Sequence, residues 1–158
     1  MTLTPVRLHS WLRLQREGVS LAARADALCH ALQDCPEVQR AVYLSWQPNA
    51  RIYSHEGAAQ HFPPGLGDPA LASDQLLFEQ LIEAGRLDLA QVRQLHCWLA
   101  GRLRRAAISH GQVFDLALQP GQAGLLLVEV CEGVSLDWLG WVRDLLTTLL
   151  SSVNGMLR

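Results

Sequence analysis

The stretch Ala123–Cys131 reads A-G-L-L-L-V-E-V-C and decides the architecture that the rest of the chain must fit. It has the length of a strand, and from Leu125 to Val128 it is apolar at every position rather than at every second one. A strand that is apolar on both sides has to be covered on both faces of its sheet. The sequence therefore predicts a buried strand here, within a sheet on which helices pack.

Three more strands are expected along the chain. Ala41–Trp46 is rich in β-branched and aromatic residues. Arg51–His55 follows it after the turn residues Gln47-Pro48-Asn49, so the two strands should pair antiparallel. Gln112–Leu118 is the third strand, and the turn Gln119–Gln122 separates it from the buried stretch.

Helical periodicity accounts for most of the remaining chain. The helix after Ser20 should end at Asp34-Cys35-Pro36, and the helix after Ser73 or Asp74 should end at Gly85. The order of helices and strands predicts an α+β domain built on an antiparallel sheet. The expected helices, with their apolar positions, are Pro5–Glu17; the helix capped by Ser20, with Leu21, Ala25, Leu28, Cys29 and Leu32; the helix capped by Ser73 or Asp74, with Leu77, Phe78, Leu81 and Ile82; Asp88–Ala107, with Val92, Leu95, Leu99 and Leu103; and Asp137–Leu157.

Composition limits the classes of protein. The 158 residues are 49% apolar and 18% charged with a net charge of −2, and no repeat or linker divides them, which predicts a single domain over 1–158. All 13 basic residues are arginine, which excludes a P-loop lysine or a Schiff-base lysine. The acidic balance argues against nucleic acid as the main partner. The first residues lack a signal peptide, and the longest uncharged stretches are too short to cross a bilayer, so we expect a cytoplasmic protein without membrane insertion.

The last expected helix carries more apolar surface than one neighbour requires. Its apolar residues cover an arc of about 180°, whereas an ordinary surface helix needs about 100°. Six of them alternate three and four apart, as in a coiled-coil seam. We expect this seam to meet the same helix of a second chain, although a helix buried against its own sheet is the alternative. The seam consists of Leu139, Val142, Leu146, Leu149, Val153 and Met156.

Two regions resemble a GAF domain. Leu21–Trp46 is similar to its opening helix and first strand (A-V-Y-L), and the strands Val113–Leu118 and Gly124–Val130 resemble the end of its sheet. The resemblance implies a GAF/PAS-like fold: an antiparallel sheet with the N- and C-terminal helices on one face and further helices and a loop over the other, where a small molecule binds. It also implies a bacterial sensory domain that dimerises and, through residues 135–158 as signalling helix, controls a C-terminal output domain in a longer parent protein.

No ligand of the GAF family carries over to this sequence. The N-K-F-D-E signature of the cyclic-nucleotide-binding members is absent, since the chain has no lysine. Cys29-His30 resembles the Cys-His pair that attaches bilin chromophores, but it lies in the opening helix, away from the pocket. The GAF-type methionine sulfoxide reductases use loop cysteines, whereas Cys29, Cys97 and Cys131 are expected in helices or at a strand end. The cofactor is therefore unknown, and no catalytic residue is assigned.

Side-chain alternation provides a candidate ligand site under the loop Gly57–Leu71, which is rich in glycine and proline. If the polar faces of the four strands coincide, five polar residues converge on one side of the sheet, as a ligand pocket requires. Strand register is not given by the sequence, and the alternative is that these residues face solvent. The five candidates are Tyr43, Tyr53, His55, Asp115 and Glu129.

Other groups offer weaker signals. His55, His61 and His96-Cys97 do not have the spacing of a metal site, so no metal is expected. Arg102, Arg104 and Arg105 gather at the end of a helix, where cations favour the helix dipole; a patch for an anionic ligand or nucleic acid is the alternative.

These observations leave three hypotheses for function. The first is a non-catalytic, GAF-like sensory dimer whose output domain is a GGDEF diguanylate cyclase that makes cyclic di-GMP, with a histidine kinase or a transcription regulator as alternative outputs. The second is a purely structural dimerisation module. The third is an enzyme that uses a cysteine as its nucleophile, which needs a thiolate beside a base.

Overall fold

The computed structural model describes residues 21–46, 51–56, 68–69, 72–116, 118 and 124–140. The expected helix Pro5–Glu17, the turns Gln47–Asn49 and Gln119–Gln122, and most of the loop Gly57–Leu71 lie outside these residues. The expected closing helix lies outside them from residue 141 onward.

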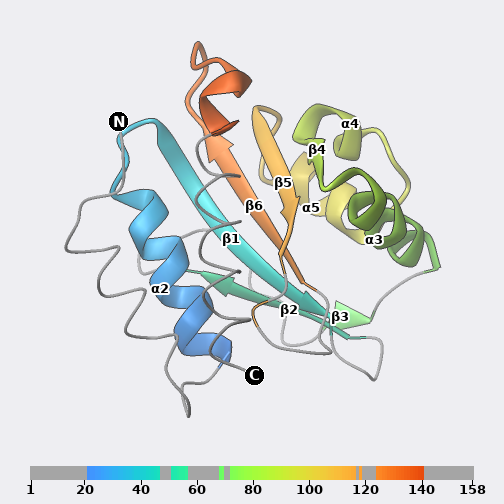
Figure 1. Cartoon of the computed structure of the whole chain (residues 1–158). Helices are drawn as coiled ribbons and strands as arrows, with labels where there is room; N and C mark the ends of the chain where they lie inside the picture. Colours follow the sequence, from blue (N-terminus) through green and yellow to red (C-terminus); the bar gives the residue numbers. More distant parts are fainter. Residues whose placement is uncertain are drawn as a thin grey trace.

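An antiparallel sheet forms the middle of the described structure (Figure 1). Its strand order is β3-β2-β1-β6-β5-β4, and every neighbouring pair is antiparallel. The four expected strands are confirmed, with bounds shifted by a few residues. Two further strands at the edges, β3 and β4, are too short for a period of two to appear in the sequence. The strands are β1 Val38–Trp46, β2 Arg51–Glu56, β3 Asp68–Pro69, β4 Arg86–Asp88, β5 Gly111–Asp115 and β6 Gly124–Val130.

Helices cover both faces of the sheet, which confirms the α+β prediction. The helix α2 (Leu21–Gln33) lies on one face, and α3 (Ala72–Ala84), α4 (Leu89–Arg93) and α5 (Trp98–Arg105) lie on the other (Figure 1). We call these the α2 face and the α3–α5 face. Strand β6 lies between β1 and β5, and from Gly124 to Val128 every residue is buried, as its unbroken apolar run predicts.

The segment expected to be one helix from Asp88 to Ala107 is instead two helices with a break between them. The first follows Asp88, whose backbone N–H is accepted by Gln91 Oε1 at 3.3 Å. The second follows Cys97, whose Sγ accepts the Ala100 N–H at 3.4 Å, so a cysteine takes the place of an N-cap hydroxyl. The prediction of a single helix was wrong because the sequence shows no sign of the break. Leu89 and Val92 before it, and Leu99 and Leu103 after it, all point into the same core at helical spacing.

The helix α3 differs from its prediction at one apolar position. Leu77, Phe78 and Leu81 are buried as expected, but Ile82 is 58% exposed. The helix already begins at Ala72 and ends before Gly85, whose φ of +80° is the left-handed conformation that glycine adopts at the end of a helix.

The chain leaves β6 through a turn and a short 3-10 helix, η1 (Leu136–Leu139). Ser135 Oγ accepts the Asp137 N–H at 3.2 Å, which caps this helix near the expected start of the closing helix. The seam residue Leu139 ends η1; the other seam residues, Val142, Leu146, Leu149, Val153 and Met156, lie outside the described residues.

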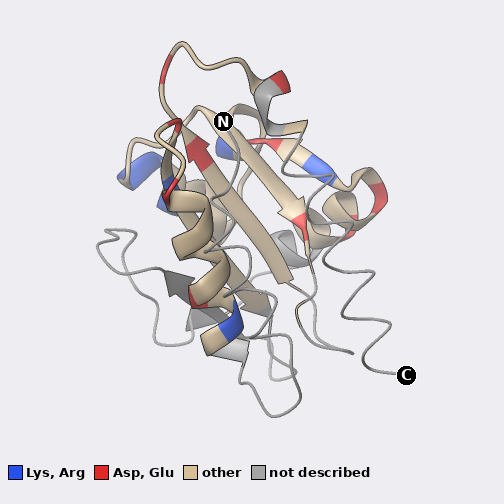
Figure 2. Cartoon of the chain, turned by 60° about the vertical axis from the view of Figure 1, so that its left-hand side comes forward, with Lys and Arg blue, Asp and Glu red and all other residues tan. Residues whose placement is uncertain are grey.

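The charged residues lie mostly outside the interiors of the strands. Charged residues of the strands, such as Asp115 of β5 and Glu129 of β6, lie mostly at or near strand ends, and the remaining charged residues lie mostly in the helices and connecting segments (Figure 2). Within the described ranges, no helix combines the length and the apolar character that a membrane crossing needs.

Candidate functional site

The five sequence-derived candidates divide between the two faces of the sheet. Tyr43 pairs with His55, and Ser45 pairs with Tyr53, so Tyr43, Tyr53 and His55 hold positions on the α2 face. Asp115 pairs with Leu125, which belongs to the core of the α3–α5 face. Glu129 alternates with Leu127 on that same face. The expected convergence of all five on one face is therefore wrong.

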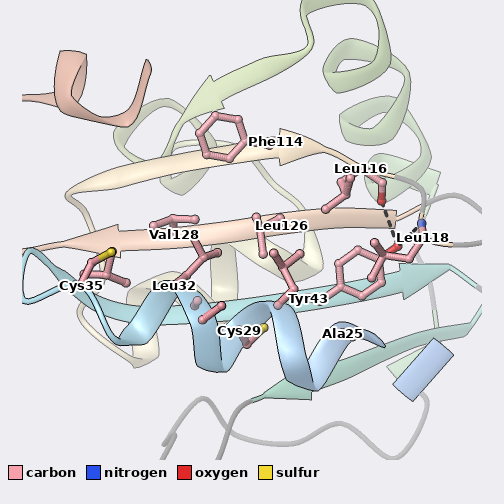
Figure 3. Packing of buried hydrophobic residues seen from close by; sticks show 14 of the residues in the cluster. Ala25, Cys29, Leu32, Cys35, Tyr43, Phe114, Leu116, Leu118, Leu126 and Val128 are labelled. Carbon is pink, nitrogen blue, oxygen red and sulfur yellow. Dashed lines mark hydrogen bonds between the residues drawn. The ribbon is translucent and has the colours of Figure 1, made fainter. Parts of the chain in front are cut away.

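Tyr43 is a structural residue of the apolar core on the α2 face. Its side chain is completely buried, and its hydroxyl donates to the Leu116 carbonyl at 2.9 Å while it accepts the Leu118 N–H at 3.3 Å (Figure 3). Burial raises the pKa of Tyr43, so the phenol stays neutral. Because the backbone already engages this hydroxyl as donor and as acceptor, Tyr43 fixes the segment that follows β5.

The helix α2 contributes one side chain to the hydrogen bonds around Tyr43. The buried Arg24 reaches from that helix and donates from Nη1 to the Leu118 carbonyl at 3.0 Å. A Cβ atom added to Gly124, the first residue of β6, would collide with the Tyr43 ring and hydroxyl. This polar group therefore joins α2, β1 and the two ends of the β5–β6 connection.

The rest of the α2 face is a closely packed apolar core. Cys29, Leu32 and Cys35 from α2 and the turn after it lie against Leu126 and Val128 of β6 (Figure 3). In β2, Tyr53 and His55 are placed by strand register opposite Ser45 and Tyr43. Their ligand-binding role stays a prediction.

Aliphatic side chains fill the α3–α5 face where the three helices lie on it. Its largest fully buried members are Leu44, Leu81, Leu89, Leu99, Leu103 and Ile108. Polar groups occur at the margins of this apolar cluster. Burial raises the pKa of Asp115 and also that of Glu129, which faces Arg40 with 3.9 Å between Nε and Oε1.

Two polar positions on the α3–α5 face were missed by sequence reasoning. Ser54 pairs with Leu44 and Glu56 pairs with Val42, and both partners belong to the core of that face. Since Tyr53 and His55 alternate with Ser54 and Glu56, β2 has polar residues on both sides. The sequence held no signal that could choose between the two faces.

His110, which the sequence analysis did not single out, connects the sheet to the segment that leaves it. Its carbonyl accepts the Val130 N–H at 3.0 Å, and its ring Nε2 donates to the Val134 carbonyl at 2.6 Å. The turn Cys131–Val134, which follows β6, is closed by the Val134 N–H, which donates to the Cys131 carbonyl at 3.1 Å. We call this group, His110 with Val130, Cys131 and Val134, the exit junction.

The cysteines of the described segments are mostly inside the molecule. Cys29, Cys35 and Cys97 are buried, and Cys131 is partly buried. Burial and the nearby Glu37 raise the pKa of Cys35, which disfavours the nucleophilic thiolate. Across the described segments, no three His, Cys, Asp or Glu residues gather as metal ligands would.

Comparisons with known proteins show the class of fold. No protein-family model and no curated protein matches the sequence. Among solved structures, the chain is similar to the phycoerythrobilin-bound GAF domain of a cyanobacterial phytochrome, with a TM-score of 0.60, 16% identity and 100% of each chain covered. It is also similar to fRMsr of Staphylococcus aureus in complex with its substrate, with a TM-score of 0.51, 13% identity, and 99% and 97% of the two chains covered.

The fold is therefore GAF-like, as the sequence resemblance implies. One of these neighbours is a pigment-binding GAF domain and the other is an enzyme, so the fold does not by itself choose between sensing and catalysis.

Proposed function

We propose that this chain is a non-catalytic sensory or regulatory domain of GAF-like fold. The observation that supports it is the exit junction. His110 follows α5, which packs on the α3–α5 face, and its ring holds the turn that leads from β6 toward the C-terminal end. A shift of α5 therefore moves the segment from which the chain continues.

In this proposal the small molecule binds at the margin of the α3–α5 face, toward β2. The helices already fill the middle of that face with aliphatic side chains. Ser54 and Glu56 hold register positions on that face, opposite Leu44 and Val42. A neighbour of the same fold binds a bilin pigment, which supports a ligand role for this class of domain.

The signal passes to a C-terminal output domain, and the domain works as a homodimer. The dimer uses the apolar seam of the closing helix, whose alternating three- and four-residue spacing supports it. A GGDEF diguanylate cyclase, which joins two GTP molecules, is the output that benefits most directly, because a dimer places two such domains together. This part of the proposal rests on sequence pattern and on how GAF domains are usually fused.

One structural feature favours the second candidate, a purely structural dimerisation module. The region of the sheet under α3, α4 and α5 is occupied by the protein's own side chains, as it would be in a domain whose pocket has filled.

Thermal unfolding with phycoerythrobilin and with a panel of small metabolites separates the two candidates. A ligand at about 100 times its dissociation constant stabilises the folded state by about 2.7 kcal/mol. If the domain is a sensor, we expect one compound to raise the melting temperature and to slow amide exchange at the exit junction. A dimer mass in light scattering with no compound shifting the melting temperature supports the structural module. A mass of one chain at micromolar concentration contradicts the dimer in both candidates.

A further inference from the structure

The segment from Leu89 to Phe114 has a charge unlike that of the rest of the chain. It contains Arg93, Arg102, Arg104 and Arg105 and no Asp or Glu, whereas all 15 acidic residues of the chain lie elsewhere. The whole chain has a net charge of −2. A strongly basic segment thus lies within an acidic protein, and its arginines occupy the last turns of α4 and α5.

Two hydrogen bonds and a ring contact hold arginine side chains along α5 and against the end of α4. Arg104 of α5 donates from Nη1 to the Arg93 carbonyl, in the last turn of α4, at 2.8 Å. The Arg102 guanidinium lies over the Trp98 ring, 5.1 Å from its centroid. Arg105 donates from Nε to the Gly101 carbonyl at 3.4 Å. We call Arg93, Arg102, Arg104 and Arg105 the arginine surface.

The arginine surface carries more charge than the helix end requires. The last turn of an α-helix presents about half a negative charge, whereas the last turn of α5 carries three guanidinium groups and that of α4 carries one. In the part of the chain that the structure describes, Arg93, Arg104 and Arg105 form no ion pair, and the last two are exposed. Three like charges in the last turn of one short helix repel one another, so a fold that keeps them there favours an anionic partner.

We propose that the arginine surface docks an acidic protein segment rich in Asp and Glu. Each guanidinium has a planar fork that binds a carboxylate through two hydrogen bonds, and Arg104 and Arg105 keep further N–H groups beyond the single bonds given above. The half-buried Trp98 adds an aromatic surface next to Arg102 for the apolar part of such a segment.

The size of the surface favours a peptide over a nucleic acid. The helix α5 has eight residues and is about 12 Å long, which matches a few residues of peptide. A nucleic acid would extend beyond this surface over the remainder of the chain, which has fewer arginines than acidic residues and would repel phosphate. The docking surface thus suits a short acidic segment of a partner protein.

Binding of a fluorescently labelled oligo-glutamate peptide, followed by anisotropy at low salt, tests this proposal. We expect the wild-type chain to bind the peptide and the double variant Arg104→Gln/Arg105→Gln to bind it at least about fivefold more weakly, because two charged contacts are lost. Arg86→Gln is the control. Arg86 is exposed, and it pairs with Phe114, so it lies on the α2 face. This control should change the affinity by less than about twofold.

A single-stranded DNA oligonucleotide of equal charge, measured in the same way, tests whether the surface distinguishes carboxylates from phosphates. The proposal is overturned if the DNA binds as tightly as the peptide and depends on the same arginines, because the surface then recognises any polyanion. It is equally overturned if the wild-type chain does not bind the peptide, or if Arg86→Gln weakens binding as much as the double variant does. Unchanged melting temperatures show that the variants are folded, and a single Arg104→Gln variant replaces the double variant if that one unfolds.

Discussion

At the scale of the residue, Tyr43 shows how a candidate ligand group becomes a structural one. Its position on β1 is polar and buried, which is the pattern of a pocket residue as well as of a satisfied core residue. The hydrogen bonds to Leu116 and Leu118 show that the hydroxyl closes the β5–β6 connection.

Tyr43→Phe should lower the free energy of unfolding by about 1–3 kcal/mol, because it leaves a buried carbonyl and a buried N–H without their partner. Gly124→Ala should destabilise the wild-type chain by a similar or larger amount, since its Cβ would collide with the Tyr43 ring. Urea denaturation measures both. In a Tyr43→Leu background the cost of Gly124→Ala should shrink, and an equal cost in the two backgrounds would contradict the assigned contact.

Glu129 gives the stability of the domain a dependence on pH. Burial raises its pKa above the ordinary value of 4.5, although the neighbouring Arg40 opposes the shift. A carboxyl group with a raised pKa binds its proton more tightly in the folded state, so its contribution to stability is greatest below 4.5 and falls as the pH rises through the folded-state pKa.

Glu129→Gln should remove this loss. The free energy of unfolding of the wild-type chain minus that of Glu129→Gln should therefore decrease from about pH 4 to about pH 7. Arg40→Gln is the matched variant: without the guanidinium the pKa of Glu129 rises further, and the decline should extend to higher pH. Denaturant titrations across this range measure the difference, and a constant difference would show that Glu129 keeps its ordinary pKa.

At the scale of the element, two glycines in the helical layer have opposite roles. Gly85 ends α3 with a φ of +80°, and among the described residues no atom lies within 4 Å of the Cβ that an alanine would add. Gly101 lies inside α5, where an added Cβ would lie 3.8 Å from Arg105 Nη2, an ordinary contact distance. Backbone conformation, rather than space, therefore distinguishes the two sites.

Gly85→Ala should destabilise the domain by about 1–2 kcal/mol, because an L-residue is strained in the left-handed region. Gly101→Ala should stabilise it by about 0.5–1 kcal/mol, because glycine loses more conformational freedom than alanine when a helix forms. Thermal and urea unfolding of the two variants give the signs directly. Effects of the same sign at both sites would contradict the helix end at Gly85 or the helical state of Gly101.

At the scale of the whole molecule, the exit junction joins the layer of α3, α4 and α5 to the end of β6. The ring of His110 makes this connection across 24 residues of sequence. If it fixes the exit segment, its removal should loosen that segment while the sheet keeps its own hydrogen bonds.

His110→Ala should speed amide hydrogen exchange in peptides that cover residues 131–139 and leave exchange in β1 and β6 unchanged, since local opening follows the loss of local contacts. Ser109→Ala, at the exposed neighbouring position, is the control and should leave both regions unchanged. Hydrogen exchange followed by mass spectrometry makes the measurement. Equal exchange in residues 131–139 of His110→Ala and the wild-type chain would show that the imidazole does not hold the exit segment.

The sequence by itself determined the identity of the main strands and the double burial of β6. These follow from apolar spacing, because burying apolar area is the largest favourable contribution to folding and marks its residues in the chain. The sequence also predicted α2 and its end before Pro36. It could not show the break between α4 and α5, since both short helices continue the same apolar spacing.

Only the tertiary structure decided the candidate site. Alternation fixes which residues of one strand share a face, but the register between strands fixes which faces coincide, and a shift of one residue reverses the result. Tyr43 and Asp115 therefore lie on opposite sides of the sheet although each follows the predicted alternation. The exit junction depends on a contact between residues distant in the sequence, and the arginine surface depends on contacts across the break between α4 and α5. The sequence could not predict either one, because no local pattern encodes which segments become neighbours.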